Sequence, residues 1–153
     1  MTIYVLGIGA NVNALHQCRR ILGQIRRAFG QVWVSELVTT KAVGIDAPDY
    51  VNGVVCFESD TDPQTLLEWC KALERQLGRD RSQKLCAADI DLLLTLDHLD
   101  GRLTEDDVAG QVEEPWFRPL VTSLFRQMPE CMWANGSSPS DSESSKPPTV
   151  ETT

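Results

Sequence analysis

The sequence predicts a single α+β domain in which an antiparallel sheet carries two helices on one face. Three observations support this fold class. Strand-like and helix-like segments follow one another in the order β-α-β-β-α-β. The chain has 153 residues, which is enough for one core and cramped for two. Its apolar fraction of 42% is ordinary for a globular protein.

The first strand and the first helix lie within the N-terminal thirty residues. Residues 2–8 are β-branched and aliphatic, and this strand-like run ends at Gly9. Asn13 is placed to cap a helix that Gly30 closes. Arginines occupy most of one side of this helix. Apolar side chains recur on the other side at Leu15, Cys18, Leu22, Ile25 and Phe29.

Two more strands and a second helix are predicted in the middle of the chain. Residues 31–39 and 50–58 have the composition of strands, and the loop 40–49 between them is rich in breaking residues. Asp62 is placed to cap the second helix, and Pro63 suits its first position. The buried stripe of this helix is predicted at Leu66, Cys70, Leu73 and Leu77.

Gly78 ends the second helix, and a polar link over 79–86 leads to a fourth strand over 88–94. These elements give the ferredoxin-like arrangement, with both helices on one face of the sheet. Beyond residue 97 the signals weaken. A short helix is expected to start near Thr104, and another covers 119–127.

The C-terminal segment differs from the rest of the chain in composition. Residues 135–153 are rich in Ser, Pro and Thr, with Val150 as their large apolar side chain. Such a segment buries too little surface to offset the entropy lost on ordering. We therefore predict a folded domain over residues 1–134 and a disordered tail over 135–153.

Charge and cysteine content argue against several classes of protein. Asp and Glu outnumber Lys and Arg by 22 to 14, whereas nucleic-acid binding needs a basic face. The five cysteines are widely spaced without a C-x-x-C pair, which favours reduced thiols in the cytosol over a metal cluster or a disulfide framework. We find no run of about 18 apolar residues that would cross a membrane. The N-terminus lacks the basic segment and cleavage site of a signal peptide.

Asp89 and Asp91 stand two residues apart in the fourth strand, so their carboxylates project from the same face. Two adjacent carboxylates repel each other unless a cation lies between them, and hard oxygen ligands suit Mg²⁺. The alternative is a solvated pair at the end of a strand. Spacing alone does not separate these interpretations, but the apolar neighbours Ile90, Leu92 and Leu94 favour a metal site.

Two further groups of side chains are candidates for ligand binding. Arg79, Arg81 and Lys84 would suit a triphosphate, although a charged loop after a helix is commonplace. Tyr50 and Asn52 share one face of a strand, where a flat heteroaromatic ligand would stack on the ring and pair with the amide. The alternative for this second group is a half-exposed strand start.

These segments, in this order, resemble 6-hydroxymethyl-7,8-dihydropterin pyrophosphokinase, an enzyme family of folate biosynthesis. The similarity runs from about Thr2 to Thr95 and continues faintly to about Pro129. Four fragments carry it: Ile8-Gly9-Ala10-Asn11, similar to I-G-S-N; Thr40, Gly44 and Pro48 to Asn52, similar to the pterin loop and strand; Glu74 to Arg81, similar to E-x-x-x-G-R-x-R; and Asp89-Ile90-Asp91, similar to D-x-D.

The resemblance implies Mg²⁺-dependent transfer of pyrophosphate from ATP to the pterin's hydroxymethyl oxygen, with release of AMP. It implies that the partners are ATP and a pterin. We expect a cytoplasmic monomer that binds neither nucleic acid nor a membrane. Carried over residue by residue, it implies pterin binding by Thr40, Val43, Tyr50 and Asn52, nucleotide binding by Lys71, Glu74, Arg102 and Thr104, catalysis by Arg79, Arg81 and Lys84, and binding of two Mg²⁺ ions by Asp89 and Asp91.

The chain departs from the family pattern at several positions. Cys86 stands where the family has an arginine three residues before the first aspartate, and the preceding link is shorter and lacks a tryptophan. Lys41 replaces a proline, and the downstream segment with a histidine and arginines has no clear counterpart. These departures favour an alternative: a catalytically degenerate paralogue that acts as a pterin-binding or protein-interaction module.

Overall fold

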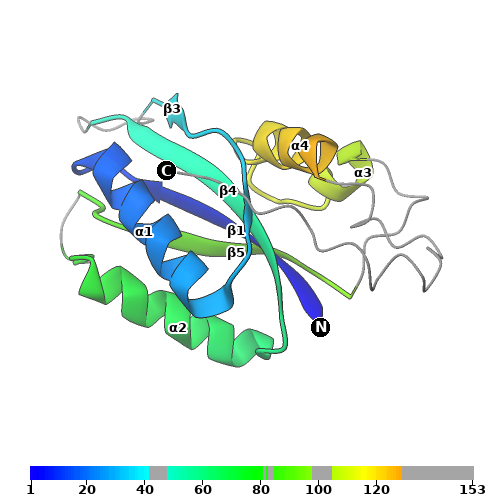
Figure 1. The fold of residues 1–153 in the computed structure, drawn as a ribbon. Coiled ribbons are helices and arrows are strands. Elements are labelled where there is room, and N and C mark those ends of the chain that lie inside the picture. The colour runs from blue at the N-terminus through cyan, green and yellow to red at the C-terminus, as the bar shows by residue number, and fades with distance from the viewer. Residues whose placement is uncertain (42–47, 81, 83–84, 98–104, 129–153) are drawn as a thin grey trace.

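The computed structural model describes residues 1–41, 48–80, 82, 85–97 and 105–128, and Figure 1 shows a sheet with helices on both faces. The predicted tail over 135–153 lies outside the described residues. The elements are β1 (Thr2–Ala10), α1 (Ala14–Phe29), β2 (Trp33–Val34), β3 (Val38–Thr40), β4 (Tyr50–Ser59), α2 (Pro63–Gln76), β5 (Asp89–Leu96), α3 (Glu105–Ala109) and α4 (Arg118–Gln127).

The sheet has the predicted antiparallel arrangement, with β1 at its centre. Its order is β2-β4-β1-β5, and β3 also pairs with β4. The register of β1 with β4 runs from Thr2 opposite Ser59 to Ala10 opposite Val51. Gly9 also pairs with Asp89 at the start of β5. The end of β1 and the starts of β4 and β5 therefore lie side by side at one end of the strands.

The two faces of the sheet bury different cores because alternate residues of a strand point in opposite directions. Tyr4, Leu6 and Ile8 of β1 pack with α1 and α2, while Ile3 and Val5 pack with α3 and α4. Figure 1 shows α1 and α2 together on one side and α3 and α4 on the other. The prediction of two helices on one face is confirmed for α1 and α2, and the C-terminal helices cover the opposite face.

The predicted second strand over 31–39 is wrong as one continuous element. It consists of β2 and β3, separated by residues 35–37. At Ser35 the side-chain hydroxyl takes the place of a backbone carbonyl in the ladder, and it accepts a hydrogen bond from the Val54 amide at 2.9 Å. Leu37 lies over Gly53, where a Cβ would come within 2.5 Å of the leucine Cδ2. The absence of a side chain at Gly53 makes room for this interruption.

The ends of α1 and α2 are formed differently. Asp62 caps α2 as predicted, accepting hydrogen bonds from the Thr65 amide and hydroxyl. Asn13 stands at the N-cap of α1 in a left-handed conformation, and its side chain makes no capping bond. Asn13 is therefore the N-cap residue as predicted, but it acts through its backbone, because its carbonyl accepts from the Gln17 amide at 3.0 Å. Gly30 closes α1 with a φ of +86°.

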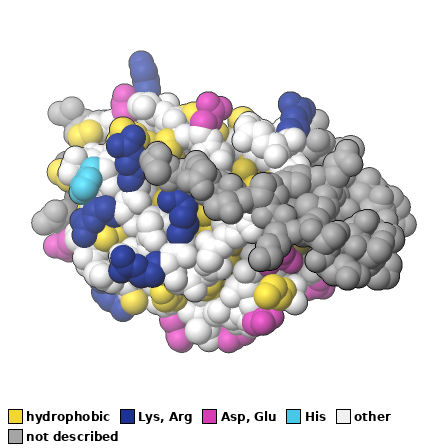
Figure 2. Space-filling model, in the orientation of Figure 1, with side chains coloured by type: hydrophobic (Ala, Val, Ile, Leu, Met, Phe, Trp, Pro, Cys, Tyr) yellow, Lys and Arg dark blue, Asp and Glu magenta, His cyan; other side chains and the backbone are white. Residues whose placement is uncertain are grey.

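The charged side chains are distributed unevenly over the surface. Figure 2 shows Lys and Arg side chains gathered over α1. Arg19, Arg20 and Arg27 are exposed there, and α1 has no acidic residue. The acidic residues behind the net charge of −8 therefore lie elsewhere in the chain. Across the described ranges, no helix has the length and hydropathy needed to cross a membrane.

Candidate active site

Three strands bring the predicted pterin and metal residues into one row at the end of β1. Gly9 pairs with Asn52 of β4 on one side and with Asp89 of β5 on the other. Directly paired residues of an antiparallel sheet project from the same face, so the two side chains share a face. A Cβ at Gly9 would lie 2.5 Å from Oδ1 of Asn52. The row therefore needs a glycine at its centre.

Asp91 lies on the same face as Asp89, opposite Gly7 of β1. Ile90 and Leu92 pack into the core under α1 and α2, which directs both aspartates to the other face. The two aspartate side chains are hydrogen-bonded to each other. Burial, and after it the charge of Asp89, raises the pKa of Asp91 to about 7. Asp91 therefore keeps its proton up to about neutral pH.

The chemistry of this pair fits a hard divalent cation that arrives with other ligands. The charge of Glu114, in the loop before α4, also raises the pKa of Asp91. Among the described residues, no three or more His, Cys, Asp or Glu side chains are grouped to hold a metal ion. Mg²⁺ commonly binds through one or two carboxylates, with substrate phosphates and water completing its shell. Asp89 and Asp91 match that pattern.

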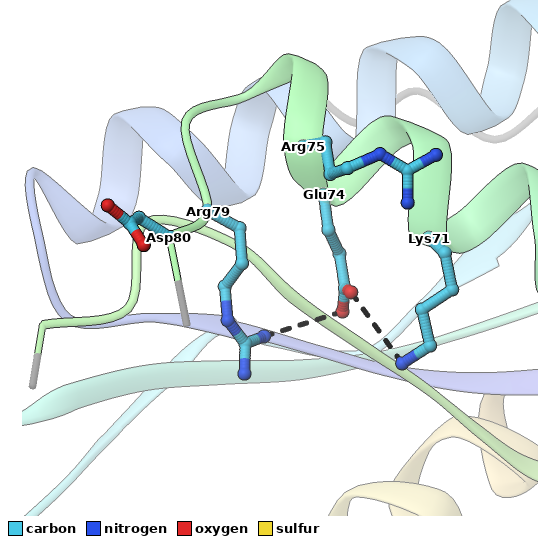
Figure 3. Close-up of a pocket in the computed structure, with 5 residues that line it drawn as sticks. All are labelled: Lys71, Glu74, Arg75, Arg79 and Asp80. Atoms are coloured by element: carbon cyan, nitrogen blue, oxygen red, sulfur yellow. Dashed lines mark ion pairs between the residues drawn. The ribbon is translucent and has the colours of Figure 1, made fainter. Parts of the chain in front are cut away.

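Glu74 is a buried carboxylate that joins α2 to the start of β5. Its side chain is 2% exposed, and its Oε2 accepts a hydrogen bond from the Ile90 amide at 2.8 Å. Figure 3 shows Lys71 and Arg79 pointing toward it from two sides. The Nζ of Lys71 lies 3.7 Å from Oε1, and Nη1 of Arg79 lies 3.5 Å from Oε2. These two cations compensate the negative charge of Glu74, which folding buries.

Arg79 links the carboxylate on α2 to the aspartate pair on β5. The chain turns at Gly78, whose φ of +100° favours glycine, and the Arg79 amide then donates to the Glu74 carbonyl at 2.9 Å. Nη1 of Arg79 donates to the Ala88 carbonyl at 2.9 Å and to Oδ1 of Asp89 at 3.1 Å. The guanidinium therefore lies beside the predicted metal ligand Asp89.

A pocket of about 330 Å³ lies on this side of α2 (Figure 3). Its lining contains three cations and two carboxylates: Lys71, Glu74, Arg75, Arg79 and Asp80. Lys71, Glu74 and Arg79 are predicted site residues, whereas Arg75 and Asp80 were not predicted. A spacing of four residues on one helix places Lys71 and Arg75 on the same face, a signal that was present in the sequence.

The residues predicted to hold the pterin are neighbours at the start of β4. Thr40 of β3 pairs with Tyr50, and its hydroxyl accepts from Nδ2 of Asn52 at 2.6 Å. The Tyr50 hydroxyl is hydrogen-bonded to the Cys86 thiol. Burial, together with Cys86, raises the pKa of Tyr50 to about 12. The phenol therefore stays protonated at every ordinary working pH.

Cys86 makes contacts that its place in the sequence does not predict. It is 5% exposed, and its thiol lies 3.4 Å from the Ala88 carbonyl. Its amide donates to Oδ1 of Asn11 at 2.6 Å, and its carbonyl accepts from the Asn11 amide at 2.9 Å. Cys86 thus ties the end of β1 to the segment before β5 and to Tyr50. No local pattern in the sequence identifies contacts over such separations.

The structure brings together eight of the predicted site residues around the end of β1 and the C-terminal end of α2: Thr40, Tyr50, Asn52, Lys71, Glu74, Arg79, Asp89 and Asp91. The remaining five lie outside the described residues: Val43, Arg81, Lys84, Arg102 and Thr104.

Comparison with known proteins agrees with this geometry. A family model described as 7,8-dihydro-6-hydroxymethylpterin-pyrophosphokinase matches residues 5–116. The chain is also 30% identical, over 101 residues, to a 2-amino-4-hydroxy-6-hydroxymethyldihydropteridine pyrophosphokinase of Haemophilus influenzae. That match covers 63% of this chain and spans 62% of the length of the relative. Because the family model covers most of its length, the chain belongs to the 7,8-dihydro-6-hydroxymethylpterin-pyrophosphokinase family.

Proposed function

We propose that the protein transfers pyrophosphate from ATP to 6-hydroxymethyl-7,8-dihydropterin in a Mg²⁺-dependent step of folate biosynthesis. The hydroxymethyl oxygen of the pterin forms a bond to the β-phosphorus of ATP. The bond between that phosphorus and the oxygen bridging it to the α-phosphorus breaks, and AMP leaves. The proton of the hydroxymethyl group is released. The products are AMP and the pterin diphosphate.

The pterin binds at the start of β4 in this proposal. Tyr50 offers a ring face to a flat heterocycle, and its hydroxyl is already satisfied by Cys86. Asn52 is 6% exposed, and its amide is oriented by the bond from Nδ2 to the Thr40 hydroxyl. An oriented amide presents one donor and one acceptor group to a ring edge, which suits a heterocycle with both kinds of group.

The triphosphate binds between the pocket beside α2 and the aspartate pair. Lys71, Arg75 and Arg79 supply positive charge in the pocket. Mg²⁺ bound by Asp89 and Asp91 would offset the negative charge of the triphosphate. A cation at Asp89 would compete with the 3.1 Å contact from Arg79, which would free this guanidinium to face a phosphate. The family motif assigns Arg81 to the same phosphate-facing role, and we assign Lys84 there as a replacement for the arginine that Cys86 displaces.

One observation carries the proposal: Asn52 and Asp89 flank Gly9 in a single row of the sheet. A pterin held by Asn52 therefore has its reacting group beside a phosphate held near Asp89. Holding two reactants in place supplies much of the rate in phosphoryl transfer. We place the reaction in the cytosol, since Cys18, Cys56, Cys70 and Cys86 are free, buried thiols.

The direct test is to incubate the purified protein with ATP, Mg²⁺ and 6-hydroxymethyl-7,8-dihydropterin and to measure AMP. We expect AMP in proportion to the pterin consumed, and none from Asp91→Ala. Asp60→Ala is the matched control, because Asp60 is exposed and lies near the N-terminal amino group at the other end of β1. Failure of the wild-type protein to bind either pterin or ATP would contradict the proposal.

The burial of Cys86 favours a second candidate, a family member that binds a pterin without catalysis. The position that carries an arginine in the family holds here a 5% exposed thiol, so it brings no cation to the phosphates. Under this alternative the pterin binds with an affinity that Asn52→Ala weakens, yet no AMP forms. The same incubation, combined with a binding titration of the pterin, separates the two candidates.

A further inference from the structure

Gln17, on the inner side of α1, uses all the hydrogen-bonding capacity of its side-chain amide nitrogen. It is 6% exposed, and its Nε2 donates to the Leu77 carbonyl and to the Ala87 carbonyl, both at 2.8 Å. Its Oε1 accepts from Nη1 of Arg20 at 3.0 Å. The contact with Arg20 fixes which way the amide points, because a guanidinium can only donate. The two amide hydrogens are thereby directed to the two carbonyls.

These two carbonyls stand at the two ends of the segment that carries Arg79. Leu77 is the C-cap of α2, and Ala87 comes two residues before Asp89. They lie 60 and 70 residues from Gln17 in the sequence. A single side chain therefore bridges the end of the helix and the start of the strand. The segment begins with a turn at Gly78, whose φ of +100° favours glycine.

We propose that Gln17 is a positioning residue for the phosphate side of the site. It holds the ends of the segment from Leu77 to Ala87 together, and through them it sets the placement of Arg79 relative to Asp89. This proposal rests on the proposed function, because Arg79 and Asp89 are the groups assigned there to the phosphates and Mg²⁺. Gln17 acts through the backbone and touches no reactant.

The pterin side has a separate anchor. Cys86, which is bonded to Tyr50, is fixed to Asn11 by two hydrogen bonds of 2.6 and 2.9 Å. Asn52 is held by Thr40 and lies over Gly9, and neither of these contacts involves Gln17. Loss of the Gln17 amide therefore affects the nucleotide side and leaves the pterin side in place. A residue needed only for general stability would not separate the two substrates in this way.

The test compares Gln17→Met, which keeps the volume and removes the amide, with Arg19→Gln, which removes an exposed charge from the same helix and leaves every contact of Gln17 in place. Initial rates of AMP formation are measured while ATP and the pterin are varied in turn. We expect Gln17→Met to raise the KM for ATP about tenfold, as expected for the loss of buried hydrogen bonds. The KM for the pterin should change less than about twofold. Arg19→Gln should match the wild type.

Equal changes in both KM values, or none, in a folded Gln17→Met protein would overturn the proposal. Should Gln17→Met not fold, Gln17→Asn is measured in the same way, because its shorter side chain cannot reach both carbonyls. A wild-type protein that forms no AMP would instead refute the proposed function. Amide hydrogen exchange then tests the clamp directly: the Arg79 amide, bonded to the Glu74 carbonyl, should exchange at least about tenfold faster in the variant. Unchanged exchange there would refute the positioning role.

Discussion

Asn52 and Asp89 lie in one row across the sheet, one on each side of Gly9. Asp89 also accepts from Arg79 at 3.1 Å, which connects this row to the pocket beside α2. The candidate site is therefore built on three strands and the end of a helix. Sites on regular elements hold their side chains more precisely than sites on loops.

A methyl group at Gly9 should impair pterin binding and leave the fold intact. In Gly9→Ala the Cβ would lie 2.5 Å from Oδ1 of Asn52 and 3.2 Å from the Val51 carbonyl, so the amide must move. We expect the KM or dissociation constant for the pterin to rise about tenfold, while that for ATP changes less than about twofold. Steady-state kinetics or a fluorescence titration with each ligand measures both.

Gly23→Ala is the matched control for that substitution. Gly23 is exposed on α1, and a Cβ there would meet nothing within 4 Å. Alanine favours a helix interior over glycine by about 1 kcal/mol, so this variant should be slightly more stable and bind both ligands normally. If Gly9→Ala also bound the pterin like the wild type, the assignment of Asn52 to the pterin would be wrong.

Removal of the Glu74 carboxylate should destabilise the protein. Glu74→Ala leaves the Ile90 amide without its acceptor and Arg79 without one of its two carboxylate partners. Breaking a buried ion pair costs about 3 kcal/mol, whereas Glu74→Gln keeps an acceptor for the amide and should cost about half as much. Urea unfolding measures both values. Glu68→Ala, an exposed carboxylate on the same helix, should change the free energy of unfolding little.

The metal-free protein should lose stability as the pH rises toward 7. Burial and the charge of Asp89 raise the pKa of Asp91 to about 7 in the folded state, whereas an unfolded aspartate has a pKa of about 3.9. The folded protein therefore holds a proton that the unfolded chain has released. The stabilising effect of this bound proton is complete below the pKa of the unfolded aspartate, and it disappears as the pH rises through 7.

Thermal unfolding with EDTA at several values between pH 5 and pH 8 measures this loss. After discounting for the partial exposure of the pair, we expect a decrease of about 1 kcal/mol. Asp91→Asn removes the titrating group and should flatten the profile, and Mg²⁺ added at pH 8 should raise the stability of the wild type alone. A variant profile as steep as that of the wild type would assign the effect to other groups.

Loss of the Cys86 thiol should lower the pKa of Tyr50. Burial and Cys86 together raise the pKa of Tyr50 to about 12, so Cys86→Ala should lower the pKa, with burial keeping it above the usual value of about 10. An ultraviolet titration of tyrosinate measures the shift, and Tyr4→Phe as background isolates Tyr50, since the chain has two tyrosines. Cys86→Ser retains a polar partner and should shift the pKa less. An unchanged pKa in Cys86→Ala would exclude the contact.

Much of the fold follows from local patterns. The apolar stripes of α1 and α2 and the cap at Asp62 predicted both helices. The two-residue period of a strand placed Asp89 and Asp91 on one face, and the same rule did so for Tyr50 and Asn52. Periodicity missed the interruption at residues 35–37, because Leu37 turns over Gly53, a neighbour on another strand.

The sequence by itself determined the order of the elements, the facing of each strand and the family to which the chain is similar. Tertiary structure alone decided that α3 and α4 cover the second face, that Arg79 lies between Glu74 and Asp89, and that Cys86 contacts Tyr50. The reason is physical. Periods of two and 3.6 residues fix the direction of a side chain within its own element. The partner that it meets depends on strand register and packing between segments far apart in the chain.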